Sequence, residues 1–213
     1  NKHSSLIADF GFVNNYESST NKTKKNLYHL FSSYDLDLDF NNYNSSELSM
    51  TIQRVSNDTY LKIFSPYITQ TPSIRPQNFD KLQNKIKLSL NHEKYNFESG
   101  METYETVKSS SGDRYQFILP YYNLDWYISQ EYFDGSFNFS SSGSNDLNNT
   151  NKLETNVIND LNYSSNDFIS NLGFKTNYFI NFKNLNSLGK NSSKYKSSPQ
   201  LELVSLFNSE LSL

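Results

Sequence analysis

The sequence lacks several features that would point directly to a function. It contains no cysteine, which excludes disulfide bonds, thiolate metal ligands and a thiol nucleophile among these residues. No run of about 18 apolar residues occurs, so no transmembrane helix is expected. Only 7 glycines and 5 prolines are present among 213 residues, and neither a GxGxxG segment nor a Walker loop is found. Nucleotide chemistry is therefore not expected.

Charged residues give no sign of a nucleic-acid partner or a catalytic centre. The 19 Lys and Arg residues nearly balance the 22 Asp and Glu residues, and the sole basic cluster is Lys22, Lys24 and Lys25. The three histidines are isolated and show no HExxH spacing, which argues against zinc. No GxSxG elbow accompanies the many serines. We therefore predict no catalytic, cofactor-binding or metal-binding residues and no enzyme activity.

Aromatic residues are abundant and argue for a folded β structure. A mean hydropathy of −0.71 would suit a disordered chain, but disordered chains are poor in aromatics. This sequence has 16 Tyr and 16 Phe. Together with frequent Asn and Ser, they favour strands and turns over helices.

A two-residue alternation of apolar and polar side chains is clearest between residues 34 and 40. There Tyr34, Leu36, Leu38 and Phe40 fall on one face of a predicted strand, and Asp35, Asp37 and Asp39 on the other. The alternation recurs at residues 48–52, 86–90 and 137–139. Longer strand-like runs cover residues 5–13, 95–107, 114–119, 153–164, 168–182 and 199–209. We expect about ten strands in all.

The predicted strands and loops have the proportions of an outer-membrane barrel. Most runs are about 9–14 residues long, whereas soluble strands average about 5–6 and tilted membrane strands need about 9–11. Short turns at 41–45, 91–94 and 164–167 alternate with longer connections at 14–26, 65–83, 143–152 and 184–198. Pro120 and Pro199 are expected at strand ends, and the other prolines in the longest loop. The predicted fold is an all-β, antiparallel, up-and-down transmembrane β-barrel segment.

Two segments resemble a known family. Gln53 to Lys62 and Tyr195 to Leu203 resemble the barrel domain of the LptD family of lipopolysaccharide-assembly (organic solvent tolerance) proteins, especially versions from AT-rich alphaproteobacteria. Phe117 to Pro120 and Val157 to Tyr163 are also similar to parts of that domain. The resemblance implies that residues 1–213 are a partial barrel domain, a fragment without the periplasmic jellyroll and the barrel ends.

The same resemblance implies a function and a set of partners. The family inserts lipopolysaccharide into the outer leaflet of the Gram-negative outer membrane. Its implied partners are lipopolysaccharide, an LptE-like lipoprotein plug, an LptA-like periplasmic bridge reached through the missing N-terminal domain, and outer-membrane lipid. No cofactor is implied. Many family members use disulfides, so the cysteines either lie outside these residues or are not used.

Several alternatives remain open from the sequence. We expect Asp35, Asp37 and Asp39 to face a hydrated lumen and Tyr34, Leu36, Leu38 and Phe40 to face lipid. The aspartates could instead bind a divalent cation, although alternate residues of a strand stand about 6.5–7 Å apart and would need help from a neighbouring strand. The chain could also be a secreted or surface β-sandwich that binds glycans, or another barrel such as a porin or receptor. An incomplete barrel with unpaired edges is expected to aggregate alone.

Overall fold

The chain forms one antiparallel sheet in which neighbours in sequence are neighbours in space. A computed structural model describes residues 3–19, 23–107, 114–128, 134–149 and 151–212. The strand order is β1-β2-β3-β4-β5-β6-β7-β8-β10-β11, and the two-residue β9 pairs with β10. The strands are β1 (Ser4–Tyr16), β2 (Lys25–Asp37), β3 (Ser45–Val55), β4 (Lys81–Asn91), β5 (Tyr95–Thr106), β6 (Tyr115–Ile128), β7 (Gly135–Asn148), β8 (Lys152–Ser165), β9 (Phe168–Ile169), β10 (Lys175–Lys190) and β11 (Gln200–Ser212).

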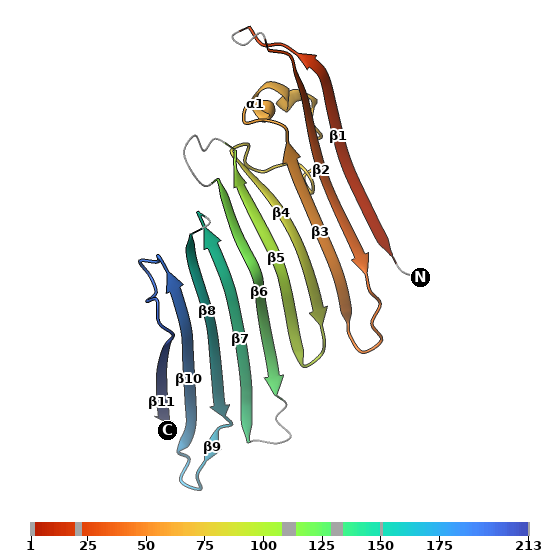
Figure 1. Cartoon of the computed structure of the whole chain (residues 1–213). Helices are drawn as coiled ribbons and strands as arrows, with labels where there is room; N and C mark the ends of the chain where they lie inside the picture. Colours follow the sequence, from red (N-terminus) through yellow and green to blue (C-terminus); the bar gives the residue numbers. More distant parts are fainter. Residues whose placement is uncertain (1–2, 20–22, 108–113, 129–133, 150, 213) are drawn as a thin grey trace.

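This topology confirms the predicted all-β, up-and-down antiparallel architecture. The sheet is open, and Figure 1 shows β1 and β11 at its two ends. Within the described residues, β1 pairs with β2 alone and β11 with β10 alone. The only helices there are α1 (Tyr60–Phe64) and the 3-10 helix η1 (Ser65–Tyr67), both between β3 and β4. Neither is long and apolar enough to cross a membrane.

The register sorts the side chains into two faces, because residues directly opposite each other in a ladder point to the same side. One side, the polar face, carries mainly charged and amide side chains: Asp9, His29, Asp35, Asp37, Glu47, Gln53, Lys85, Lys87, Glu98, Glu102, Asn123, Asp125, Asp146, Glu154, Asn156, Asp160 and Lys183. The other side, the apolar face, carries Leu6, Phe10, Phe12, Leu30, Tyr34, Leu36, Leu48, Met50, Ile52, Ile86, Leu88, Leu90, Phe97, Leu124, Trp126, Phe139, Leu161, Phe182, Leu203 and Phe207.

The buried core lies mainly between the polar face of β2 and the segment of residues 56–80 that contains α1. This covering segment contacts β1, β2 and β3, and Figure 1 shows α1 beside the ends of β2 and β3. The core consists of Leu27, Phe31, Tyr60, Leu61, Ile68, Ile74, Leu82 and Val107. Apolar residues of β2 thus pack against the covering segment and give it a fixed position.

The apolar face carries no second layer in the described part of the chain. Leu6, Phe10 and Phe207 are 69%, 65% and 64% exposed. In a β-sandwich this face would pack against another sheet at about 10 Å. Here the covered face is the polar one, which is the reverse of the arrangement in a soluble two-layer domain.

Several strands end at other residues than their polar composition predicts. The strand predicted through Phe40 stops at Asp37, because the backbone N–H of Asp39 donates to Asp37 Oδ1 at 3.0 Å and Asp39 takes a φ of 54°. Asp residues favour such local turns. Leu38, Asp39 and Phe40 therefore lie beyond the strand, and the predicted strand is three residues too long. The directions expected for their side chains stay a prediction.

Two predicted long loops also contain strand residues. Residues 143–152 include the end of β7 and the start of β8, and residues 184–198 include the last part of β10. These Asn- and Ser-rich stretches resemble loops in composition, yet several of their polar side chains lie on the polar face of the sheet. Pro120, expected at a strand end, lies inside β6 at a register shift between Ile118 and Tyr121. An extra residue at a bulge relieves the ladder of the missing N–H.

Docking of the covering segment should depend on Leu61. This side chain is 1% exposed, whereas Ile63 in the same helix is 40% exposed. Leu61→Ala is expected to cost about 3 kcal/mol of local docking free energy, since it removes buried methyl groups and leaves a cavity. Amide hydrogen exchange in residues 56–80 should accelerate accordingly, while Ile63→Ala should change it little. Equal exchange in both variants would contradict the docked position.

Candidate functional site

Ion pairs between neighbouring strands line the polar face. Lys85 Nζ lies 2.8 Å from Glu102 Oε1, across the β4–β5 ladder. On the same two strands, Lys87 pairs with Glu98 at 3.4 Å. Further along the sheet, Lys183 Nζ of β10 lies 3.0 Å from Asp160 Oδ2 of β8. Pairing lowers the cost of placing these part-exposed charges on one face, because an unpaired charge away from water is costly.

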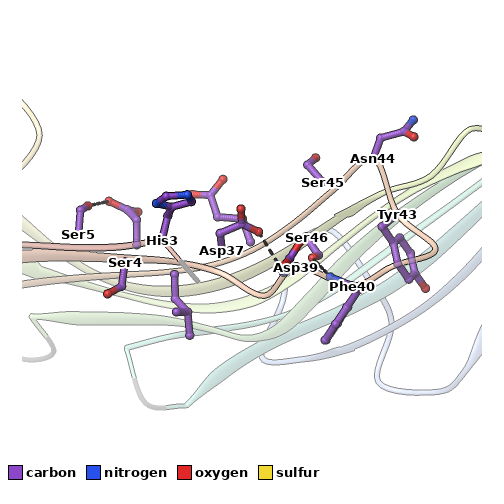
Figure 2. Close-up of a pocket in the computed structure, with 13 residues that line it drawn as sticks. His3, Ser4, Ser5, Asp37, Asp39, Phe40, Tyr43, Asn44, Ser45 and Ser46 are labelled. Atoms are coloured by element: carbon purple, nitrogen blue, oxygen red, sulfur yellow. Dashed lines mark hydrogen bonds between the residues drawn. The ribbon is translucent and has the colours of Figure 1, made fainter. Parts of the chain in front are cut away.

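The predicted aspartates lie in a hollow of about 410 Å³ at the rim where β2 turns into β3. Figure 2 shows Asp37 and Asp39 together with His3, Tyr43 and the serines around them, and Asp35 lines the same hollow. Asp35 Oδ2 accepts hydrogen bonds from the Ser5 and Ser33 hydroxyls at 3.5 and 3.4 Å. The register places Asp35 and Asp37 on the polar face, while Asp39 belongs to the turn.

The apolar partners of these aspartates divide in the same way. Tyr34 and Leu36 lie on the apolar face, opposite Met50 and Leu48 of β3. Leu38 and Phe40 belong to the turn, where the Phe40 N–H donates to Ser46 Oγ at 3.0 Å. Across the described residues, no group of three or more His, Cys, Asp or Glu side chains is arranged to hold a metal ion. The rim hollow is thus lined mainly by carboxylates, hydroxyls and other polar side chains.

Aromatic side chains gather at the same rim. Tyr43 makes edge contacts with His92 and Tyr95, at centroid distances of 5.9 and 6.0 Å. The Tyr95 hydroxyl donates to the Tyr43 hydroxyl at 3.0 Å. Trp126 stands directly opposite Tyr95 in the next ladder. Rings with a polar edge thus gather at one end of the apolar face.

A small polar network anchors the covering segment to the polar face. His29 Nδ1 is 2.8 Å from the Tyr60 hydroxyl, and its Nε2 is 3.1 Å from Asp9 Oδ2, without the alignment of a hydrogen bond. Asp9 Oδ2 also accepts the Thr69 N–H at 2.8 Å. Burial, aided by the Asp9 charge, raises the pKa of Tyr60, so its phenol stays protonated near neutral pH.

No sequence motif indicates this network. His29 has no histidine, cysteine or acidic partner at a motif spacing, so the sequence predicts no role for it. Its partners stand on another strand and on the covering segment, at residues 9 and 60. A contact made across a ladder and a long loop leaves no local pattern.

Three strand-interior glycines each face an aromatic ring on the neighbouring strand. Gly11 stands opposite His29, Gly100 opposite Tyr121 and Gly143 opposite Tyr122. In every case a Cβ on the glycine would come within 3.0 Å of the ring. A side chain larger than that of glycine at these positions would collide with the ring. Each ring instead covers the exposed backbone of its glycine.

A row of hydrogen-bonded polar side chains crosses the apolar face. The Tyr122 and Ser141 hydroxyls lie 3.1 Å apart, and Ser141 donates to Asn159 Oδ1 at 2.7 Å. Asn159 Nδ2 in turn donates to Asn184 Oδ1 at 3.0 Å. Because each group in this polar row satisfies the next, the row can sit in an apolar setting at reduced cost.

Comparison with known proteins adds no assignment. No model of a protein family matches the sequence, and no curated protein matches it either. The proposed function therefore rests on the geometry of the two faces of the sheet.

Breaking the polar row at one point should be more damaging than removing it. Asn159→Leu removes one hydrogen-bond partner each from Ser141 and Asn184, which keep their contacts with Tyr122 and Asn186. We expect a loss of about 1–3 kcal/mol in the free energy of unfolding. The triple variant Ser141→Ala, Asn159→Leu, Asn184→Leu should recover most of that loss. Denaturant unfolding in detergent measures both values. A triple variant less stable than the single one would disprove the mutual satisfaction of these groups.

Proposed function

We propose that the chain forms part of the wall of an outer-membrane β-barrel, with its apolar face toward lipid and its polar face toward a hydrated lumen. The observation that carries this proposal is the bare apolar face on a sheet whose polar face holds the ion pairs and the covering segment. In water, each Å² of exposed apolar surface costs about 25 cal/mol relative to burial. Acyl chains would remove that cost.

The strand lengths support the same proposal. Apart from β9, the strands contain 11 to 16 residues. At about 3.3 Å per residue and a tilt near 40°, a strand of this length spans roughly 30 Å, the thickness of the hydrocarbon core. The aromatic cluster at the β2–β3 rim would then lie at the headgroup level.

Within this wall, the finer proposal is transport of lipopolysaccharide. It rests on the resemblance of residues 53–62 and 195–203 to the LptD barrel. The first segment runs from β3 into α1 of the covering segment, and the second leads into β11. The partners in this proposal are lipopolysaccharide, an LptE-like plug and an LptA-like bridge. The polar face would line the route of the saccharide.

The soluble sandwich is the weaker candidate. It requires a second layer over the apolar face, and the described strands all belong to a single sheet. A porin or receptor would use the same wall, so the wall and its cargo need separate experiments.

Adjacent positions of β3 provide a matched test of the wall. Ser49 lies on the polar face opposite Asp35, and Met50 on the apolar face opposite Tyr34. With single cysteines in the full-length parent expressed in a Gram-negative outer membrane, Ser49→Cys should react with a membrane-impermeant thiol reagent. Met50→Cys should react with a lipid-soluble reagent alone. Equal labelling of both by the impermeant reagent would reject the wall.

The cargo is tested by depleting the parent protein. Lipopolysaccharide at the cell surface should fall severalfold within a few generations, as measured by a surface-specific antibody, if the barrel exports it. Restoring the parent on a plasmid is the control. If surface lipopolysaccharide is unchanged but the cysteines label as expected, the barrel wall is supported and lipopolysaccharide is rejected as its cargo.

A further inference from the structure

A second hollow opens on the polar face, away from the covering segment. Its volume is about 330 Å³, at the lower end of the range for small-molecule sites. It spans strands β4 to β8 and is lined mostly by polar side chains, with small residues between them. Its lining includes Lys85, Glu98, Glu102, Tyr121, Asn123 and Asp146.

Tyr121 supplies a fixed aromatic surface in this hollow. Its ring lies over Gly100, with the hydroxyl 2.9 Å and Cε1 3.0 Å from the place where a Cβ would stand. The hydroxyl donates to Glu98 Oε1 at 3.3 Å, which holds the ring in place. Ile118 lines the same hollow. An apolar surface is therefore preorganised among hydrogen-bonding groups.

Planar polar side chains surround that ring. Asn123 is its neighbour on the same face of β6, and Asp146 and Asn156 stand on β7 and β8. Ser144 joins the last two, because its hydroxyl donates to Asp146 Oδ2 at 3.1 Å and accepts from Asn156 Nδ2 at 3.1 Å. A ligand with an apolar C–H face and a rim of hydroxyls, such as a pyranose, matches this arrangement.

The charges of the hollow select among such ligands. One lysine lines it against three carboxylates, and that lysine is engaged by Glu102 at 2.8 Å. A phosphate or carboxylate group on the sugar would meet like charge without a free cation among these lining residues, which is unfavourable. The lining therefore favours an uncharged saccharide.

We propose that this hollow is a saccharide subsite in which Tyr121 stacks on a neutral pyranose ring and Asn123 and Asp146 bind its hydroxyls. The arrival of a saccharide rests on the proposed function, because the polar face would line its route. Recognition rests on the hollow itself.

The chain offers a matched control for Tyr121. Tyr122 also lies over a cross-strand glycine, Gly143, but on the apolar face. With the full-length parent in detergent, maltotriose binding is measured by saturation-transfer NMR titration. Tyr121→Ala should weaken binding about tenfold, the loss of one aromatic contact, whereas Tyr122→Ala and Tyr121→Phe should retain it.

Two further measurements keep the test decisive. Asn123→Ala leaves Tyr121 on Gly100 and should weaken binding severalfold, so the outcome does not depend on folding of the Tyr121→Ala variant. A phosphorylated maltotriose should bind more weakly than maltotriose. The subsite is rejected if maltotriose fails to bind, if the Tyr121 and Tyr122 variants lose binding equally, or if the phosphorylated sugar binds as tightly. The cysteine labelling of Ser49 and Met50 reads the wall without sugar, so the two proposals can fail separately.

Discussion

The structure depends on one constraint, which is that a single continuous sheet must satisfy its backbone while its two faces meet different surroundings. Each interior strand on the main path of the sheet pairs with two neighbours, so most of its N–H and C=O groups are satisfied within the sheet. The two-residue period then directs charged side chains to one face and apolar side chains to the other. An uncovered apolar face is unfavourable in water and suits acyl chains, which is why the proposed wall follows from the pairing.

The polar face of the sheet is covered in one part and open in another. The covering segment occupies β1 to β3 and is held by buried apolar residues as well as by Asp9, His29 and Thr69. Beyond it, the face remains open and carries the hollow around Tyr121. A fixed segment beside an open polar surface gives the face two functionally different parts, one closed and one able to receive a ligand.

Much of the fold could be predicted because alternation is a local property. The strands around Leu48, Ile86 and Phe137 were found from a few residues each, and their antiparallel order followed from short turns. Strand ends were less predictable. Ser and Asn occur both in turns and on the polar face, so their composition predicts loop where β7 and β10 continue. The alternation at residues 34–40 predicts strand where Asp39 forms a turn.

The sequence by itself determined the fold class, the number of strands within about one, and the face to which Tyr34, Asp35, Leu36 and Asp37 belong. Only the tertiary structure decided which face is covered and which residues meet on it. The covering segment, the contacts of His29, and the glycine–aromatic pairs join residues that are distant in sequence. Their positions depend on ladder register and on the path of a long loop, and neither leaves a periodic signal in the chain.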